Sequence, residues 1–213
     1  MVSAAPHKAH PSRMTGENRR QQIVAVAAEL FASKGFSGTT TKEIAEGAGV
    51  SEAIIFRHFA SKDQLYAAIL DFKVKQGTER MKAQLEEAAS RKDDRAFFGS
   101  LALEMLEFHS KDRTFMRLLL FSALEGHELS NIFFDSTARD IKNHIRKYIK
   151  QRTSDGAFRA IDPAVAARAF VGMVLHQVQA RIIFKDDDVK LSNRQIADRF
   201  VEIFLNGVRD SEA

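Results

Sequence analysis

The chain has 213 residues, of which 45% are hydrophobic and 28% charged, and this composition is too apolar for a mostly disordered protein. It has no cysteine, which excludes disulfides and cysteine-based metal sites, and only 3 prolines, so few residues interrupt helical patterns. The formal net charge of +4 favours anionic partners, and no stretch approaches the roughly 18 consecutive apolar residues of a membrane span. We therefore expect a soluble, cytoplasmic protein with no membrane partner.

The first two elements in chain order are an arm and a helix. Residues 1–16 carry two prolines and scattered basic side chains but no continuous apolar segment of the kind found in a signal peptide, so we expect a disordered arm. Apolar residues at helical spacing then predict a helix from Glu17 to Lys34, and Gly35 supplies its stop.

Two short helices follow. Thr40 and Glu43 have the spacing of a capping box, which predicts a helix that ends at the glycine-containing turn of residues 47–49. Ser51 is expected to cap a third helix running through Phe59. Both helices are too short to form a core except against their neighbours.

The middle of the chain keeps the same helical spacing. Ser61 and Gln64 predict a second capping box that opens a long helix reaching toward Leu85. Further apolar patterns of helical period follow over residues 97–105, 115–119 and 141–149. No segment alternates with the period of a strand.

Strong start signals mark the last two helices. Asp162 followed by Pro163 predicts a helix running to about Phe184, and Ser192 with Gln195 predicts a capping box for the final one. The acidic run of residues 186–188 between them is expected to be a solvated loop, although such a run could also hold a metal. The fold class predicted is all-α, with about nine helices and no sheet.

The segment from Thr40 to Phe59 has the spacing of a DNA-binding helix-turn-helix, because two short helices are joined by a turn of about four residues that contains glycine. Similar helical pairs are common in all-α proteins. The spacing alone therefore leaves both DNA binding and a purely structural role open.

The residues in and around this segment resemble the N-terminal signature of the tetracycline-repressor (TetR) family in order and spacing. The similarity covers about fifty residues, in the runs 39–45, 48–51, 55–59 and 61–63 and at Leu65. It implies a homodimer of nine-helix chains, in which the first three helices bind DNA and the last two form a four-helix interface. The expected domains are a DNA-binding domain over 17–62 and a ligand-binding and dimerisation domain over 63–213.

The third helix has the faces of a recognition helix. At about 100° per residue, Ile55 and Phe59 share a core face, while Ala53 and Arg57 point nearly opposite, toward a groove. Positions on the two flanks could meet base edges or the DNA backbone; they are Glu52 with Phe56, and Ile54 with His58. Glu52, Ile54 and Phe56 depart from the residues usual in the family; Ile54 could instead pack on a thymine methyl, and Glu52 could accept from cytosine N4.

Basic side chains and a helix N-terminus supply the expected DNA contacts. Lys42 and Arg57 are predicted to read bases, because basic side chains donate to guanine O6 and N7. Thr40 and Thr41, with the backbone N–H groups that open the second helix, suit a phosphate, and Lys62 offers a second phosphate clamp. The alternative for the lysines is a solvated surface position, and for His58 it is the seam between two helices.

The resemblance also implies a ligand cavity in the larger domain. Candidate lining residues are polar or adaptable side chains on apolar helical faces, namely Met105, His109, Met116 and His176. A satisfied core histidine is the alternative for each histidine. The 17 phenylalanines favour an apolar or aromatic effector.

A symmetric homodimer is expected because two operator half-sites require two recognition helices related by a two-fold axis. The last two helices carry broad apolar faces, and the interface residues expected on them are Phe170, Met173, Phe200 and Phe204.

We therefore predict a transcriptional repressor that binds a palindromic operator and is released by a small molecule, with no metal, cofactor or enzymatic activity. Activation in place of repression stays open. One alternative is a helical hydrophobic-ligand carrier or enzyme without DNA binding, although the sequence has no HExxH, Gly-rich phosphate loop or nucleophile elbow. Another is a regulator that responds to a protein partner.

Overall fold

The computed structural model describes residues 15–126, 133–134, 137–186 and 188–209. Over these residues it contains nine α-helices and one π-helical segment, with no strand beyond an isolated bridge between Phe158 and Arg209. The all-α prediction is confirmed. Most of the predicted N-terminal arm, residues 1–14, lies outside the described residues, and none of the described helices is both long and apolar enough to cross a membrane.

Three helices form the N-terminal unit: α1 (Gly16–Lys34), α2 (Thr41–Gly47) and α3 (Glu52–His58). The hydroxyl of Thr15 caps α1, and Gly35 ends it with a φ of 77°, which favours glycine. The predicted capping box of α2 is complete, since the Thr40 hydroxyl accepts from the Glu43 N–H and the Glu43 carboxylate accepts from the Thr40 N–H.

Two predicted caps differ in the structure. Ser51 occupies the N-cap position of α3, but its side chain makes no capping hydrogen bond. At the start of α4 (Lys62–Ser90), the Ser61 hydroxyl accepts from the Gln64 N–H as predicted, whereas the Gln64 side chain accepts from the Ala60 N–H at 3.1 Å instead of closing the box. The spacing located both helix starts but not the full bonding pattern.

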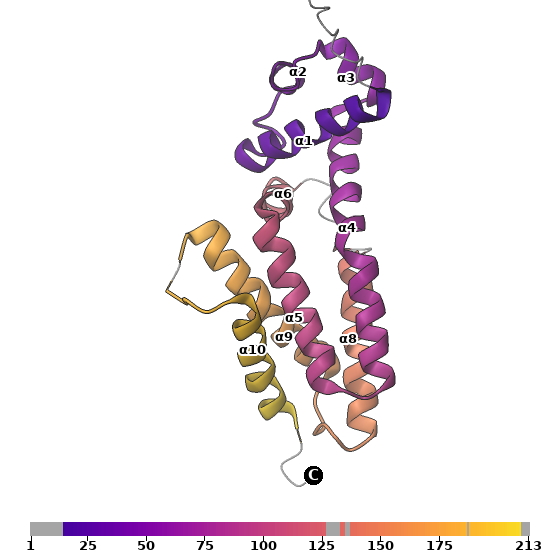
Figure 1. Cartoon of the computed structure of the whole chain (residues 1–213), viewed down its shortest axis with the longest axis vertical. Helices are drawn as coiled ribbons and strands as arrows, with labels where there is room; N and C mark the ends of the chain where they lie inside the picture. Colours follow the sequence, from indigo (N-terminus) through magenta and orange to yellow (C-terminus); the bar gives the residue numbers. More distant parts are fainter. Residues whose placement is uncertain (1–14, 127–132, 135–136, 187, 210–213) are drawn as a thin grey trace, which may run out of the picture.

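The larger domain consists of α4, α5 (Asp94–Lys111), α6 (Arg113–Leu124), α8 (Thr137–Ser154), α9 (Pro163–Gln179), the π-helical segment η1 (Ala180–Phe184) and α10 (Asn193–Val208). Figure 1 shows α4 descending from the N-terminal helices beside α8. Helix α5 is central, because it packs against α4, α9 and α10. The predicted helix from Pro163 to Phe184 is α9 continued by η1.

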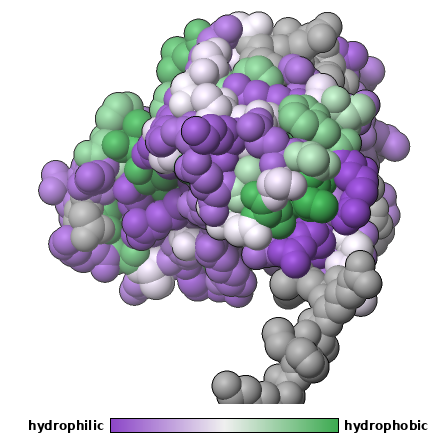
Figure 2. All heavy atoms as spheres, turned by 90° about the horizontal axis from the view of Figure 1, so that it is seen from above, coloured by the Kyte–Doolittle hydropathy of each residue, from purple (hydrophilic) through white to green (hydrophobic). Residues whose placement is uncertain are grey.

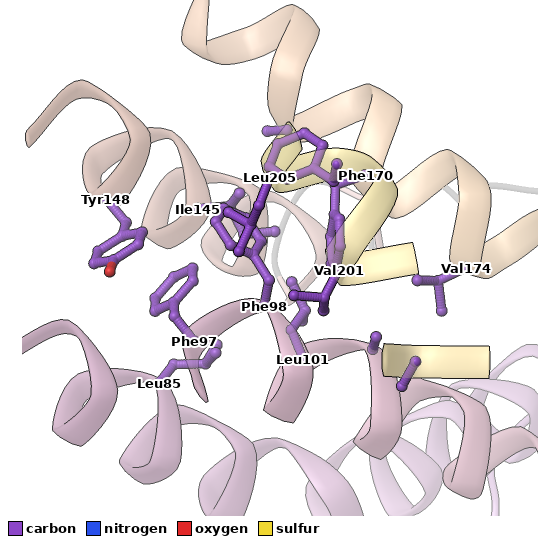
Figure 3. Packing of buried hydrophobic residues seen from close by; sticks show 14 of the residues in the cluster. Leu85, Phe97, Phe98, Leu101, Ile145, Tyr148, Phe170, Val174, Val201 and Leu205 are labelled. Carbon is purple, nitrogen blue, oxygen red and sulfur yellow. The ribbon is translucent and has the colours of Figure 1, made fainter. Parts of the chain in front are cut away.

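Two apolar clusters hold the chain together. The first unites α1, α2 and α3 with the first turns of α4 and with α6, so the expected domain boundary after residue 62 falls inside a shared core. The second fills the larger domain (Figure 3), where the ring centroid of Phe98 lies 4.8 Å from those of both Phe170 and Phe204. Inclined ring pairs at such distances add to the stabilisation from buried area.

A buried ionic network joins the start of α5 to the end of α8. Asp94 is only 8% exposed, and its Oδ1 accepts from the Tyr148 hydroxyl at 2.7 Å and from Arg152 Nε at 2.8 Å. Burial, followed by the hydrogen bond to Asp94, raises the pKa of Tyr148, while the same carboxylate raises the pKa of Arg152. Both side chains therefore keep the protonation state that the network requires.

Candidate functional site

Burial confirms the faces that helical spacing predicted for α3. Ile55 and Phe59 are buried against α1 and α4, whereas Ala53 and Arg57 are exposed on the other side. Phe56 is 49% exposed on the same open surface, which is a large exposure for an aromatic side chain. Seen from the end of the molecule that carries α2 and α3, the surface is mainly hydrophilic with separate apolar patches (Figure 2).

Hydrogen bonds between side chains fix α2 relative to α3 and α1. The Thr41 hydroxyl donates to Glu52 Oε2 at 2.6 Å, which joins the two helices of the motif. Glu43 accepts from Thr40 and from Lys34, and these contacts, with Lys34 the largest, lower the pKa of Glu43 to about 2. Thr40, Thr41 and Glu52 therefore position the motif in the DNA-free chain.

Lys42 and Arg57 are cations on this surface without an ion-pair partner among the described residues. Both side chains are exposed, and neither forms a salt bridge or side-chain hydrogen bond within the part of the chain that the structure describes. Lys42 lies in the first turn of α2 and Arg57 in the last turn of α3. A guanidinium and an ammonium without intramolecular partners can donate hydrogen bonds to guanine edges or to phosphates.

The position of Lys62 argues against the predicted phosphate clamp. Its ammonium donates to the backbone carbonyl of Phe36 and lies 4.1 Å from the centroid of the Phe36 ring. Burial lowers the pKa of Lys62, as expected for an ammonium drawn into the seam between α1 and α4. The ammonium therefore ties the start of α4 to the loop between α1 and α2, a role that the pattern around Lys62 did not reveal.

His58 is half-buried at the end of α3. Its Nε2 is out of contact with solvent and has no partner among the described residues, and its ring lies 6.4 Å from that of Phe59. This nitrogen cannot reach a phosphate without a movement of the ring.

Helix α6 ties the larger domain to α1. The Thr114 hydroxyl donates to Glu29 Oε1 at 2.9 Å, and Arg117 Nε donates to the carbonyl of Ala32 at 2.6 Å. Both bonds join residues 85 positions apart in the chain, so no local sequence pattern could have predicted them.

The end of α6 holds the loop that leads into the motif. The Glu125 carboxylate accepts from the backbone N–H groups of Phe36 and Ser37 at 3.0 and 3.3 Å. The Tyr66 hydroxyl of α4 donates to the carbonyl of Leu118 at 2.8 Å. A displacement of α6 would therefore act on α1, on α4 and on the loop before α2.

A cleft of about 450 Å³ opens between the end of α5, the start of α6 and η1. Its apolar wall comes from Leu106, Val178 and Ile182. Such a volume lies within the range of small-molecule sites. Of the predicted ligand residues, only His109 lines it.

The other three ligand candidates lie elsewhere. Met116 is buried in the second apolar cluster, and Met105 packs half-buried against that cluster. His176 is exposed on α9, so its prediction as a cavity residue is wrong for the isolated chain. Helical spacing placed His176 on an apolar helix but could not show which of its faces turns inward.

Burial lowers the pKa of His109 from 6.5 to about 4, against a smaller opposing effect of Asp112. Between these values the unfolded chain binds more protons than the folded one, so stability is full above pH 6.5 and falls as the pH drops toward 4. The shift corresponds to roughly 3 kcal/mol of unfolding free energy. In urea unfolding from pH 7 to 4, we expect H109F, which retains an aromatic ring, to lose stability less steeply than the natural chain. Equal slopes would contradict this assignment.

Two of the four expected interface residues are buried inside the chain's own core. Phe170 and Phe204 contact Phe98, while Met173 and Phe200 lie half-buried at the edge of the second cluster. The expectation that Phe170 and Phe204 lie on an open face is therefore wrong. The more apolar side of each helix turns inward, which leaves a second face to solvent.

The exposed side of α9 and α10 carries small and apolar residues among charged ones such as Arg168 and Arg199. Val165 and Ile203 are 63% and 62% exposed. Ala169 and Gly172 lie one and two turns after Val165 on the same exposed side of α9, and a Cβ on Gly172 would meet no atom within 4 Å. We call Val165, Ala169, Gly172 and Ile203 the α9–α10 face.

Comparison with known proteins gives consistent matches over both parts of the chain. Residues 23–69 match the family model of bacterial regulatory proteins of the tetR family. Residues 100–207 match the model of the C-terminal domain of AefR-like transcriptional repressors. An uncharacterised helix-turn-helix regulator of Bacillus subtilis, YvkB, is 27% identical over 191 residues, covering 88% of this chain and 96% of YvkB.

Solved structures show the same fold. The fatty acid degradation regulator FadR of Bacillus halodurans has a TM-score of 0.70 at 17% identity, covering 89% of this chain and 99% of FadR. AibR, solved in complex with isovaleryl coenzyme A and operator DNA, has a TM-score of 0.69 at 23% identity, covering 87% of this chain and 97% of AibR.

Proposed function

This chain belongs to the tetR family of bacterial regulatory proteins, and from that premise we propose that it represses transcription by binding a palindromic operator as a homodimer. The observation that carries the proposal is the exposed face of α3, where Arg57 stands beside Ala53 and Phe56 while the opposite face is buried. A short helix with one anchored and one open face suits insertion into the major groove.

We assign base reading to Arg57 and Lys42. Each can donate to guanine, and a good bidentate pair discriminates by about 1–3 kcal/mol. Phe56 and Ala53 offer apolar contact to a thymine methyl, and the N–H groups at the start of α2 face a phosphate. Thr40, Thr41 and Glu52 hold the two helices of the motif together, and they contact DNA only if their present hydrogen bonds rearrange. Lys62 is not among the proposed DNA contacts.

The homodimer is proposed to form through the α9–α10 face. Its small residues allow close approach of two helices, and exposed Val165 and Ile203 supply apolar area that the chain does not bury itself. A two-fold axis through this face presents two copies of α3 to two half-sites.

Release by a small molecule is proposed to act through α6. The cleft touches the start of α6, and α6 holds α1 through Thr114 and Arg117. A ligand that prefers one arrangement of α6 shifts the population toward it, and one without such preference shifts nothing. The presence of a cleft favours a small molecule over a protein partner as the signal.

The base-reading assignment predicts the effect of R57A. We expect its affinity for a preferred duplex to fall at least tenfold while its affinity for unrelated duplexes changes little, because a lost base contact removes discrimination and not general attraction. Fluorescence anisotropy with the preferred duplex and with single-base variants measures both quantities. R95A, which removes an exposed arginine of α5 far from the motif, is the control. A uniform loss of affinity with sequence preference retained would remove Arg57 from base reading.

A further inference from the structure

The rim of the cleft between α5, α6 and η1 is rich in positive charge. Arg113, Arg181 and Lys185 line it together with one carboxylate, that of Asp186. The formal charge of this set is +2, from three cations and one anion. Clefts with charge of one sign and low-dielectric walls concentrate ligands of the opposite sign.

The cations of the rim have different roles. Arg181 donates to Asn193 Oδ1 and to the carbonyl of Leu191, each at 2.9 Å, so it fixes the wall of the cleft. Arg113 and Lys185 are exposed and form no salt bridge within the described residues. These two side chains are therefore open to a ligand.

The wall that carries Arg181 and Lys185 has an unusual backbone. Residues Ala180–Phe184 form a π-helix, and Lys185 follows in the left-handed region with a φ of 55°. The carbonyl of Ala180 accepts from the N–H groups of both Lys185 and Asp186. Such π-helical turns and left-handed non-glycine residues occur often at functional sites.

His109 supplies an unsatisfied polar group in the same cleft. The side chain is 7% exposed, and its Nδ1 is buried without a partner among the described residues. A neutral imidazole has one N–H donor and one acceptor, and, as for His58, the ring must turn before the buried Nδ1 can bond a ligand headgroup. A buried polar atom without a partner otherwise costs free energy.

We propose that this cleft binds an amphipathic anion, a carboxylate or phosphate ester with a short alkyl chain. The headgroup lies among His109, Arg113 and Lys185, and the chain lies along Leu106, Val178 and Ile182. The proposal replaces the expectation of a purely apolar or aromatic effector. The anion site itself does not depend on the proposed function. Only the identification of this anion as the effector rests on it, because Arg113 is the first residue of α6, the helix through which release is proposed to act.

Calorimetric titration of the full chain without DNA tests the proposal. The probes are octanoate and octyl phosphate, with 1-octanol as the neutral molecule of equal chain length. We expect at least one anion to bind tenfold or more tightly than octanol. R113Q and K185Q are each expected to weaken that anion about tenfold, as hydrogen bonds to charged groups are worth enough for such a change. R95Q, with the same loss of charge at the other end of α5, should bind like the natural chain.

Three results would overturn the proposal. The first is that octanol binds as tightly as both anions, and the second is that neither anion binds at 1 mM probe, a limit of about 4 kcal/mol of binding free energy. The third is an unchanged anion affinity in the R113Q/K185Q double variant. The preference between octanoate and octyl phosphate identifies the headgroup. Since no DNA is present, the outcome is independent of operator binding. If the chain binds the anion and stays bound to its operator DNA, the anion is not the ligand that releases the operator. The proposed anion site would be unaffected by that result.

Discussion

I203E is expected to leave each chain folded but to convert the dimer into monomers and to reduce affinity for a palindromic duplex more than a hundredfold. Ile203 is 62% exposed on α10, so its replacement disturbs little of the chain's own core. In a dimer built on the α9–α10 face, the glutamate would be an unpaired charge buried at the interface, which is strongly unfavourable. A monomer also loses the gain in affinity that comes from two linked recognition helices.

Sedimentation velocity measures the assembly, and anisotropy with the preferred duplex measures binding. V189E places the same charge on an exposed apolar residue of the loop before α10 and should remain dimeric. A second interface variant is G172E, where the added Cβ meets no atom of the protomer within 4 Å, and it should behave like I203E. Dimers in both interface variants would contradict the assignment of this face.

D94A is expected to lower the free energy of unfolding by about 3 kcal/mol, because it leaves the half-buried Arg152 with Asp155 as its remaining carboxylate and leaves the Tyr148 hydroxyl without its acceptor. Urea unfolding at neutral pH measures the loss. The control is D140A, which removes an exposed aspartate of α8 that lies 3.9 Å from Lys82. An exposed pair contributes about 0–1 kcal/mol, so the two variants should differ clearly. An equal loss in both would show that the buried network contributes no more than a surface pair.

Local signals in the sequence predicted most of the helical layout. The capping boxes at Thr40 and Ser192 are complete in the structure, and Asp162 caps the helix that Pro163 begins. The period of Ile55 and Phe59 also predicted correctly which face of α3 is buried. Each of these signals involves residues within a few positions of one another, where backbone geometry alone sets their relation.

The sequence could not show the relations that depend on packing between distant helices. Phe170 and His176 lie on one helix that is apolar on more than one side, and only the contact of Phe170 with Phe98 shows which side is the core. Lys62 was predicted to clamp a phosphate because it lies at the start of the fourth helix, beside the DNA-binding motif, whereas its ammonium contacts the ring and carbonyl of Phe36. The π-helical turn of residues 180–184 and the basic cleft beside it carry no local signature at all.

The central claim is that two chains bind a palindrome through paired copies of α3. Selection of bound sequences from random duplex DNA tests it most directly, followed by measurement of the number of chains on the recovered duplex. The account predicts two half-sites about one helical turn or a multiple of it apart, bound by two chains. Failure to enrich any sequence, with only weak salt-sensitive binding to all duplexes, would contradict it.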